Sequence, residues 1–392
     1  MSEELNAYPP KKKICFVVSA ILTAEAFLCD HIEGLSDDYD VYLVGKFTSN
    51  ELAVLNEFKL SGYHSVEIYR NISLYKDFKS VLELKKYLKR ENFFAVHSVT
   101  PKAGLISALA SILAHVPNRI HIFTGQVWYT KTGIQKPFLM LIDKVIAKLN
   151  THILVDGESQ RQFLIENRIL RTSNSYVLGK GSISGVNIVR FQPKPEMRVN
   201  LRKDLNLAGK VVFGFLGRLN RDKGIQELYT AFDKLAKNNL NVHLLFIGRD
   251  EENMLSLLPN YANIHDGINF TNLGVTKKPE DILQMMDVFC LPSYREGFGT
   301  SVLEASCLGI PVICSDTYGL MDAMVDDVTG LRHKVGKSED LYDNMKILAN
   351  NKTIREEMGK NARKFVIENF SGETITNEWV KFYNSLKYGS SH

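Results

Sequence analysis

The sequence predicts an α/β protein with two Rossmann-like domains whose parallel sheets face each other across a cleft. Three observations support this fold class. The chain has 392 residues, more than one hydrophobic core usually serves. Short apolar runs alternate with amphipathic stretches of helical period, as in βαβ units with parallel strands. This alternation occurs twice, once in each half of the chain.

The first half contains five apolar runs that predict strands. They lie at residues 14–19, 41–44, 94–97, 120–123 and 152–156. Helical patterns occur between them, including those at 80–89 and 103–115. Alternating strands and helices of these lengths predict the N-terminal domain, for which we expect the bounds 1–190.

The second half repeats the pattern. Strands are predicted at 211–216, 243–247, 288–291 and 312–315, with helices that include 225–237 and 280–286. The Gly- and Ser-rich segment 179–193 ends in proline and predicts the junction, so the second domain is expected at 191–373. A last helix at about 374–386 carries Trp379, Phe382 and Tyr383, and we expect the C-terminal segment 374–392 to pack back on the first domain.

Composition points to a soluble globular protein. Hydrophobic residues make up 45% and charged residues 23% of the chain. The polar start does not read as a signal peptide, and the longest apolar stretches, near 106–116 and 138–149, are too short or too charged to span a bilayer. We therefore expect a cytoplasmic protein without a membrane span. The spacing of the five cysteines predicts reduced core thiols and no zinc site; these are Cys15, Cys29, Cys290, Cys307 and Cys314.

Positive charge is concentrated in the first half. Residues 1–190 hold 23 Lys and Arg against 18 Asp and Glu, a net +5, so the total of +4 leaves −1 for the remainder. One predicted helix carries Lys85, Lys86, Lys89 and Arg90, and a second apolar segment is flanked or interrupted by Lys131, Lys136, Lys144 and Lys148. A solvated helix face and an interface with anionic lipid both explain this pattern. No stripe of basic and aromatic residues predicts nucleic-acid binding.

The first chemical motif is GRLNRDKG at 217–224, between an apolar strand and an amphipathic helix. Gly217 permits a sharp turn, and Arg218 and Lys223 flank a helix N-terminus, where free amides and the helix dipole favour an anion. A diphosphate fits this position. An exposed turn with two surface cations fits the spacing equally well.

The second motif is EGFGTSVLE at 296–304, after the predicted strand 288–291. Two carboxylates, Glu296 and Glu304, flank a Gly-Phe-Gly turn whose backbone amides are open to a ligand. Glu304 has a structural alternative, because Ser301-x-x-Glu304 fits a capping box. At the same position its carboxylate could instead accept from the hydroxyls of a ribose.

The two motifs in this order resemble those of the family-four retaining glycosyltransferases of the GT-B fold. The resemblance spans most of the chain and is most specific at 210–335; the segments 326–331 and 356–365 also look like the family's C-terminal region. It implies that Arg218 and Lys223 bind the diphosphate of a nucleotide sugar and stabilise charge on the leaving group, so that no metal or other cofactor is needed. It further implies that Glu296 binds the sugar and Glu304 the ribose. The remaining implied donor contacts are Gly217, Gly248, Arg249, Leu273, Gly274, Val275, Gly297, Phe298, Gly299, Thr300 and Ser301.

The first half resembles a narrower group, the bacterial enzymes that build capsule, O-antigen and other lipid-linked glycans. The segments 97–104, 124–128, 155–164 and 179–186 carry this resemblance. It implies a catalytic or acceptor contact for His97, which we expect at a strand end facing the cleft, and weaker acceptor contacts for Lys102 and Thr124. A hydrogen-bonded structural histidine is the alternative. The loop 19–24 departs from relatives because it lacks their glycine pair, which puts its contact with the diphosphate in doubt.

The resemblance implies a UDP-sugar donor, often an N-acetylhexosamine or its 6-deoxy form, and a polyprenyl-diphosphate-linked acceptor at the inner face of the membrane. It favours front-face attack with retention over a covalent intermediate. Four alternatives were weighed. A dehydrogenase would need Gly-x-Gly-x-x-Gly, and a P-loop NTPase would need a glycine one residue closer to Gly336-Lys337-Ser338 than Gly330 is. A GT-B epimerase or phosphorylase and a non-catalytic sugar-nucleotide binding module stay open.

Overall fold

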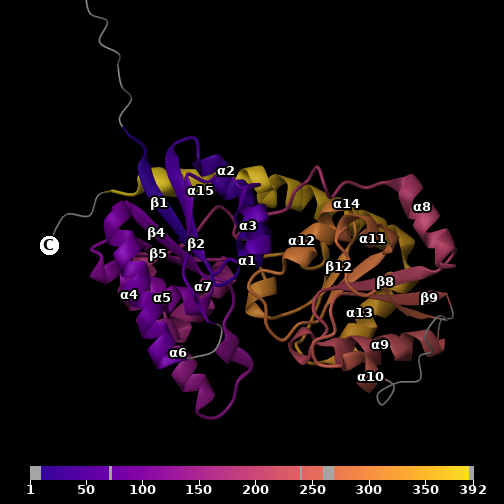
Figure 1. The fold of residues 1–392 in the computed structure, drawn as a ribbon. Helices are drawn as coiled ribbons and strands as arrows, with labels where there is room; N and C mark the ends of the chain where they lie inside the picture. Colours follow the sequence, from indigo (N-terminus) through magenta and orange to yellow (C-terminus); the bar gives the residue numbers. More distant parts are fainter. Residues whose placement is uncertain (1–9, 70–72, 239–240, 259–268, 388–392) are drawn as a thin grey trace, which may run out of the picture.

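The computed structural model describes residues 10–69, 73–238, 241–258 and 269–387, and it forms two lobes (Figure 1). Residues 1–9 and 388–392, the ends of two predicted segments, lie outside the described residues. The first lobe is built on a seven-stranded parallel sheet of order β3-β2-β1-β4-β5-β6-β7. Its strands are β1 (Lys12–Val17), β2 (Tyr39–Gly45), β3 (Gly62–Ser65), β4 (Ala95–Val99), β5 (Asn118–Phe123), β6 (His152–Val155) and β7 (Ser175–Val177).

The second lobe contains a six-stranded parallel sheet of order β10-β9-β8-β11-β12-β13. Its strands are β8 (Val211–Leu216), β9 (Val242–Ile247), β10 (Phe270–Asn272), β11 (Val288–Leu291), β12 (Val312–Ser315) and β13 (Gly330–His333). Two parallel sheets, each with helical crossovers, confirm the predicted α/β fold class of two Rossmann-like domains.

Helices connect successive strands in both lobes, as parallel pairing requires. The first lobe has α1 (Ile21–Phe27), α2 (Cys29–Leu35), α3 (Ser49–Leu55), α4 (Leu74–Glu91), α5 (Pro101–Leu113), α6 (Gln135–Leu149) and α7 (Glu158–Glu166). The second has α8 (Pro195–Asp204), α9 (Ile225–Asn238), α10 (Met254–Leu257), α11 (Pro279–Ile282), α12 (Thr300–Cys307), α13 (Ser338–Asn350) and α14 (Lys352–Phe370), and α15 (Gly372–Ser385) follows. Of the described helices, none combines the length and the apolar character needed to cross a bilayer.

Sequence analysis found every central strand and missed the four edge strands. The missed strands are β3, β7, β10 and β13, which lie at the outer positions of the two sheets. They are three or four residues long. Because an edge strand is covered less completely than a central one, its sequence lacks a continuous apolar run. The predicted helix at 280–286 divides into α11 and a 3₁₀ turn over Leu283–Met285.

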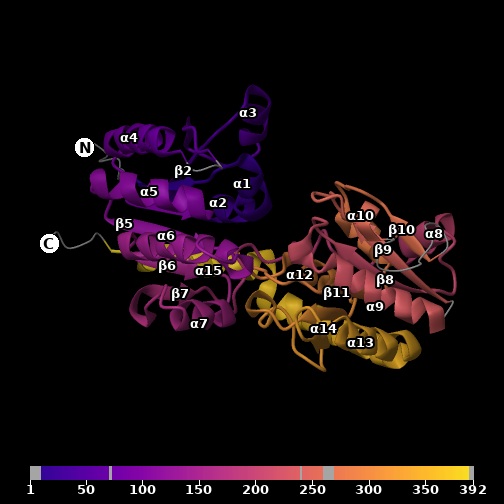
Figure 2. The same cartoon turned by 90° about the horizontal axis from the view of Figure 1, so that it is seen from below.

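The C-terminal helix α15 crosses from the second lobe and packs on the first, against α2 (Figures 1 and 2). Trp379 stacks on His31 with ring centroids 4.4 Å apart. Thr376 in α15 also pairs with His31, with 2.8 Å between Oγ1 and Nδ1. The last helix therefore ties the end of the second domain to the core of the first. The domain boundaries given above stay a prediction.

Candidate active site

A cleft of about 410 Å³ lies between the two lobes. It is placed at the carboxyl ends of parallel strands, where ligands of doubly wound sheets bind. The second lobe contributes the residues that follow β8 and β11, and the first contributes residues that follow β5 and β6. Its lining comprises Phe27, Thr124, Asp156, Ile183, Leu216, Gly217, Arg218, Asn220, Asp222, Lys223, Arg295, Glu296, Gly297, Phe298, Gly299, Thr300, Ser301 and Glu304.

The segment 217–224 forms a tight connection between β8 and α9. Residues Arg221–Lys223 make one 3₁₀ turn, and Gly224 closes it with a left-handed φ of +67°. A Cβ at Gly224 would overlap the carbonyl oxygen of Pro292, so glycine is required both by the backbone conformation and by the space available. This turn aims Lys223 into the cleft at the start of α9.

Lys223 and Glu296 form an ion pair inside the cleft, between Nζ and Oε1. The two side chains are 17% and 11% exposed, so both charges are largely withdrawn from water. Ser293 donates a second hydrogen bond to the same carboxylate oxygen, at 2.7 Å from Oγ to Oε1. The resemblance assigned Lys223 to the diphosphate and Glu296 to the sugar, and it did not predict that the two side chains pair with each other.

Arg218 lies at the mouth of the same cleft and is the more available cation. Its side chain is 53% exposed, and its guanidinium is 3.3 Å from the carboxylate of Glu251. An exposed pair of this kind contributes little to stability. Arg218 is therefore free to turn toward an anion. Lys223 can bind an anion only when it gives up its ion pair with Glu296.

The turn after Glu296 leads into α12. Gly299, in the left-handed region at φ +76°, caps the helix, which begins at Thr300, and no side chain caps its first turn. The capping-box alternative for Glu304 is therefore wrong, because Glu304 is the fifth helical residue and not the third. Its carboxylate makes no hydrogen bond or ion pair within the described chain, and burial raises the pKa of Glu304 to about 7.

The first lobe approaches the same turn through the ends of β5 and β6. A Cβ on Gly297 would lie 2.5 Å from the carbonyl oxygen of Thr124 and 2.6 Å from Oδ2 of Asp156. The two lobes thus meet at Gly297, which only glycine can occupy without moving them apart. Asp156 was missed by sequence analysis. The signal for it was an acidic residue directly after the apolar strand β6.

The predicted placement of His97 is wrong. It lies in the middle of β4, is 1% exposed and does not line the cleft. Its Nδ1 is 3.0 Å from the hydroxyl of Tyr383, and its ring stacks on Trp379 at 4.9 Å between centroids. The strand continues two residues beyond the predicted end, so His97 belongs to the core under α15. This geometry is the structural alternative considered for it.

Other predicted contacts also lie away from the cleft lining. Lys102, in the first turn of α5, forms an ion pair with Asp77 at 2.5 Å. Ser19 of the glycine-free loop pairs with Thr100 at 3.2 Å between hydroxyl oxygens. A further group of the predicted donor contacts follows β9 and β10, where Gly248 donates to the carbonyl of Gly274 at 2.8 Å. None of this group lines the cleft; it comprises Gly248, Arg249, Leu273, Gly274 and Val275.

Comparisons with known proteins agree with this architecture. Residues 197–365 match the family described as glycosyl transferases group 1. The capsular polysaccharide biosynthesis glycosyltransferase CapM of Staphylococcus aureus is 31% identical over 348 residues, which cover 88% of this chain and 90% of CapM. The N,N'-diacetylbacillosaminyl-diphospho-undecaprenol alpha-1,3-N-acetylgalactosaminyltransferase of Campylobacter jejuni is 27% identical over 318 residues, 79% of this chain and 81% of that enzyme.

A solved structure shares the fold over almost the whole chain. Anabaena HepE in complex with UDP-glucose superposes with a TM-score of 0.79 at 19% identity, covering 95% of this chain and 100% of HepE. This likeness establishes the GT-B arrangement of the two domains. Together with the identity to CapM over most of both chains, it leads to one conclusion: the protein belongs to the group 1 glycosyltransferases.

Proposed function

We propose that this glycosyltransferase moves a sugar, an N-acetylhexosamine or its 6-deoxy form, from a UDP-sugar to a polyprenyl-diphosphate-linked saccharide during synthesis of a bacterial surface polysaccharide. The observation that carries the proposal is the cleft in which Arg218, Lys223 and the turn 296–300 converge. The names of CapM and of the Campylobacter enzyme support the surface-glycan and lipid-linked parts of the proposal.

The donor would lie across the second lobe. Arg218 and Lys223 would hold the diphosphate, and the open amides of the turn before α12 would take a phosphate oxygen. The carboxylate of Glu304, which has no partner in the described chain, suits the two hydroxyls of a ribose. Glu296 would be released from Lys223 when the diphosphate arrives, and would then be free to accept from a sugar hydroxyl.

For the chemical step we propose retention by front-face attack. The bond from the anomeric carbon to the diphosphate oxygen breaks, the acceptor hydroxyl bonds to the same face, and its proton passes to the leaving diphosphate. Lys223 and Arg218 stabilise the charge that develops on that group, as preorganised cations do. These two cations replace the metal ion that would otherwise neutralise the diphosphate, so we propose that transfer needs no divalent metal.

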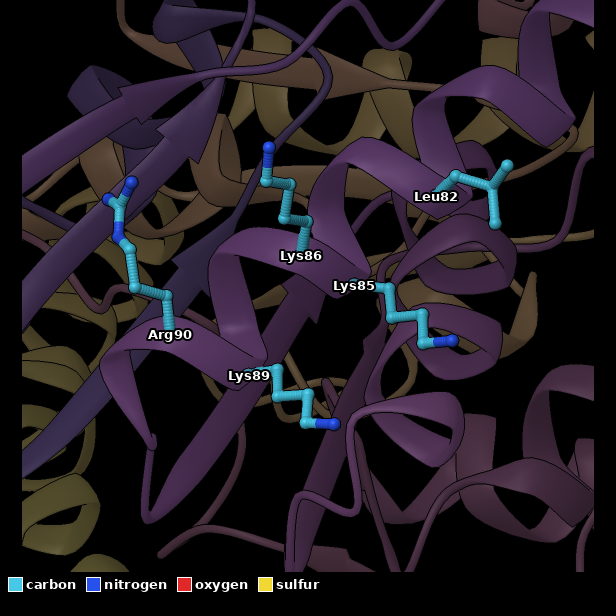
Figure 3. Close-up of a pocket in the computed structure, with 5 residues that line it drawn as sticks. All are labelled: Leu82, Lys85, Lys86, Lys89 and Arg90. Atoms are coloured by element: carbon cyan, nitrogen blue, oxygen red, sulfur yellow. The ribbon is translucent and has the colours of Figure 1, made fainter.

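A lipid-linked acceptor requires a membrane, and one face of the first lobe suits an anionic surface. Helices α4, α5 and α6 pack side by side there (Figure 1). A hollow on α4 is lined by Leu82, Lys85, Lys86, Lys89 and Arg90, without a carboxylate among the lining residues (Figure 3). Along α6 the apolar side chains of Phe138, Leu141 and Val145 are exposed. We therefore propose peripheral binding at the cytoplasmic face of the membrane.

The activity test supplies UDP-glucose, UDP-N-acetylglucosamine and UDP-N-acetylgalactosamine with a polyprenyl-diphosphate-linked N-acetylhexosamine, with and without EDTA. We expect one donor to give an α-linked product by NMR at a rate that EDTA does not change. A β-linked product would refute retention, and loss of activity in EDTA would refute metal independence. Isomerised UDP-sugar without acceptor would identify an epimerase, phosphate-dependent turnover a phosphorylase, and binding without turnover a sugar-nucleotide binding module.

The membrane test compares sedimentation with vesicles of phosphatidylglycerol and phosphatidylcholine. Each cation near an anionic surface contributes about 1 kcal/mol. Substitution of Lys131, Lys136, Lys144 and Lys148 by glutamine should therefore lower sedimentation strongly with anionic vesicles and leave transfer to a water-soluble acceptor intact. Unchanged sedimentation would show that these lysines are a solvated helix face.

A further inference from the structure

Asp156 is a buried acid in the cleft for which the mechanism above has no use. It follows the last residue of β6, is 2% exposed and lines the cleft on the side of the first lobe. Its Oδ1 is inaccessible and has no hydrogen-bond partner. Within the described chain, neither carboxyl oxygen of Asp156 accepts a hydrogen bond or forms an ion pair.

The surroundings explain why the carboxyl is left without a partner. The side-chain amide of Gln160, four residues further along the chain, is already used, because its Oε1 accepts from the Asp156 backbone N–H at 2.7 Å and its Nε2 donates to the carbonyl of Phe123 at 3.2 Å. The Asp156 carbonyl accepts from Ser182 N–H at 2.6 Å. The backbone N–H and carbonyl of Asp156 thus both have hydrogen-bond partners, whereas its carboxyl group has none. Buried polar groups are nearly always paired in proteins, so this exception calls for a ligand.

The position of the carboxyl points to the sugar end of the donor. Its Oδ2 lies against Gly297, the residue after Glu296, where the two lobes meet. The groups suited to the nucleotide, Arg218 and Glu304, belong to the second lobe. A sugar held on the turn 296–300 would therefore be covered from the first lobe by Asp156.

We propose that Asp156 is a specificity-determining residue that hydrogen-bonds the sugar ring of the nucleotide-sugar donor, an inference that rests on the proposed function. The group it recognises is one that accepts a hydrogen bond, such as a ring hydroxyl or an acetamido oxygen. Burial raises the pKa of Asp156 to about 8, which favours the protonated acid near neutral pH, and a protonated acid has a proton to donate. Asparagine has the same shape and also both donates and accepts, which makes it the conservative substitute.

The test measures two affinities for each variant by calorimetry: that for UDP, and that for the UDP-sugar the wild type turns over fastest among UDP-glucose, UDP-N-acetylglucosamine and UDP-N-acetylgalactosamine. We expect Asp156→Ala to weaken UDP-sugar binding at least tenfold and to leave UDP binding within twofold. Asp156→Asn should keep UDP-sugar binding within about threefold. Asp143→Asn is the matched control, because Asp143 is also buried in the first lobe but accepts from Trp128 Nε1 at 2.7 Å outside the cleft lining.

Three results would overturn the proposal. Unchanged affinities of Asp156→Ala for both UDP and UDP-sugar would show that the sugar does not need this group. Equal loss of UDP and UDP-sugar binding would show a structural role only. An asparagine variant as defective as the alanine variant would show that the ionised acid is what matters. If the wild type binds UDP but turns over neither these three donors nor a 6-deoxy UDP-N-acetylhexosamine, the proposed function itself fails, and the Asp156 proposal fails with it.

Discussion

Replacement of Glu296 by glutamine separates donor binding from transfer. In the cleft Glu296 neutralises Lys223, and both side chains are largely buried. The same lysine is the cation we assign to the diphosphate. Glutamine keeps the size of the side chain and its capacity to accept from Ser293, but it removes the charge that competes with the ligand for Lys223. The variant should therefore bind UDP more tightly while it transfers sugar poorly.

The size of the effect follows from the burial of the pair. Removing one partner of a buried pair costs about 3–5 kcal/mol, because the other charge stays behind uncompensated. Because this pair lines an open cleft, we expect Glu296→Gln to lower the free energy of unfolding by about 2 kcal/mol. For a domain of this size that loss lowers the melting temperature by roughly 4–8 °C. A diphosphate that takes over Lys223 recovers most of that energy. At 1.4 kcal/mol for each factor of ten, UDP binding should become about tenfold tighter.

Calorimetry with UDP and steady-state transfer with the active donor check both parts. Glu296→Gln should bind UDP about tenfold more tightly and transfer about 10² to 10³ times more slowly, the range for loss of one preorganised polar group. The control is Glu251→Gln, which frees Arg218 from an exposed pair worth at most about 1 kcal/mol and should change UDP binding less than threefold. UDP binding that falls in parallel with transfer would refute the roles we give to this pair.

Three further outcomes are expected. Burial holds the pKa of Glu304 at about 7, above its unfolded value, so the ligand-free protein loses stability as pH rises toward 7; Glu304→Gln should raise the melting temperature at pH 8 but not at pH 5. Gly297→Ala places a Cβ 2.5 Å from the Thr124 carbonyl and should slow transfer at least tenfold, measured at saturating donor. Tyr383→Phe removes the bond to His97 and should cost about 1 kcal/mol in thermal melts with UDP affinity unchanged.

Central strands and the cleft lining that follows β8 and β11 were predictable because their signals are continuous in the sequence. The run at 211–216 is apolar throughout and became β8 with the predicted bounds. The two motifs that follow β8 and β11 each place their polar residues within nine positions. The local turn in each motif is therefore enough to bring its polar residues to the same end of the sheet. Edge strands such as β3 (GYHS) carry no such run, and only pairing with β2 identifies them.

Residues that depend on contacts between distant segments were not predictable. His97 looked like a cleft residue because its strand was expected to end there, but α15 arrives 286 positions later and covers it. Helix α12 begins at Thr300 because Gly299 adopts a left-handed backbone conformation, which cannot be read from the amino-acid sequence. In both cases the local pattern permitted two readings, and the tertiary contact chose between them.

The same reasoning explains why Asp156 escaped notice although it stands directly after β6. Helix α7, which follows β6, is held by the second lobe: Ser159 donates to Asp322 at 2.6 Å, and Phe163 stacks on Tyr318 at 4.2 Å between centroids. Tyr318 in turn accepts from the backbone N–H of Gln126, so one segment of the second lobe touches both α7 and the loop after β5. This contact draws Asp156 against the turn at Gly297. An acid that a single domain would leave at an open strand end is buried without a partner by the meeting of two domains, and a substrate is what can supply the missing bond.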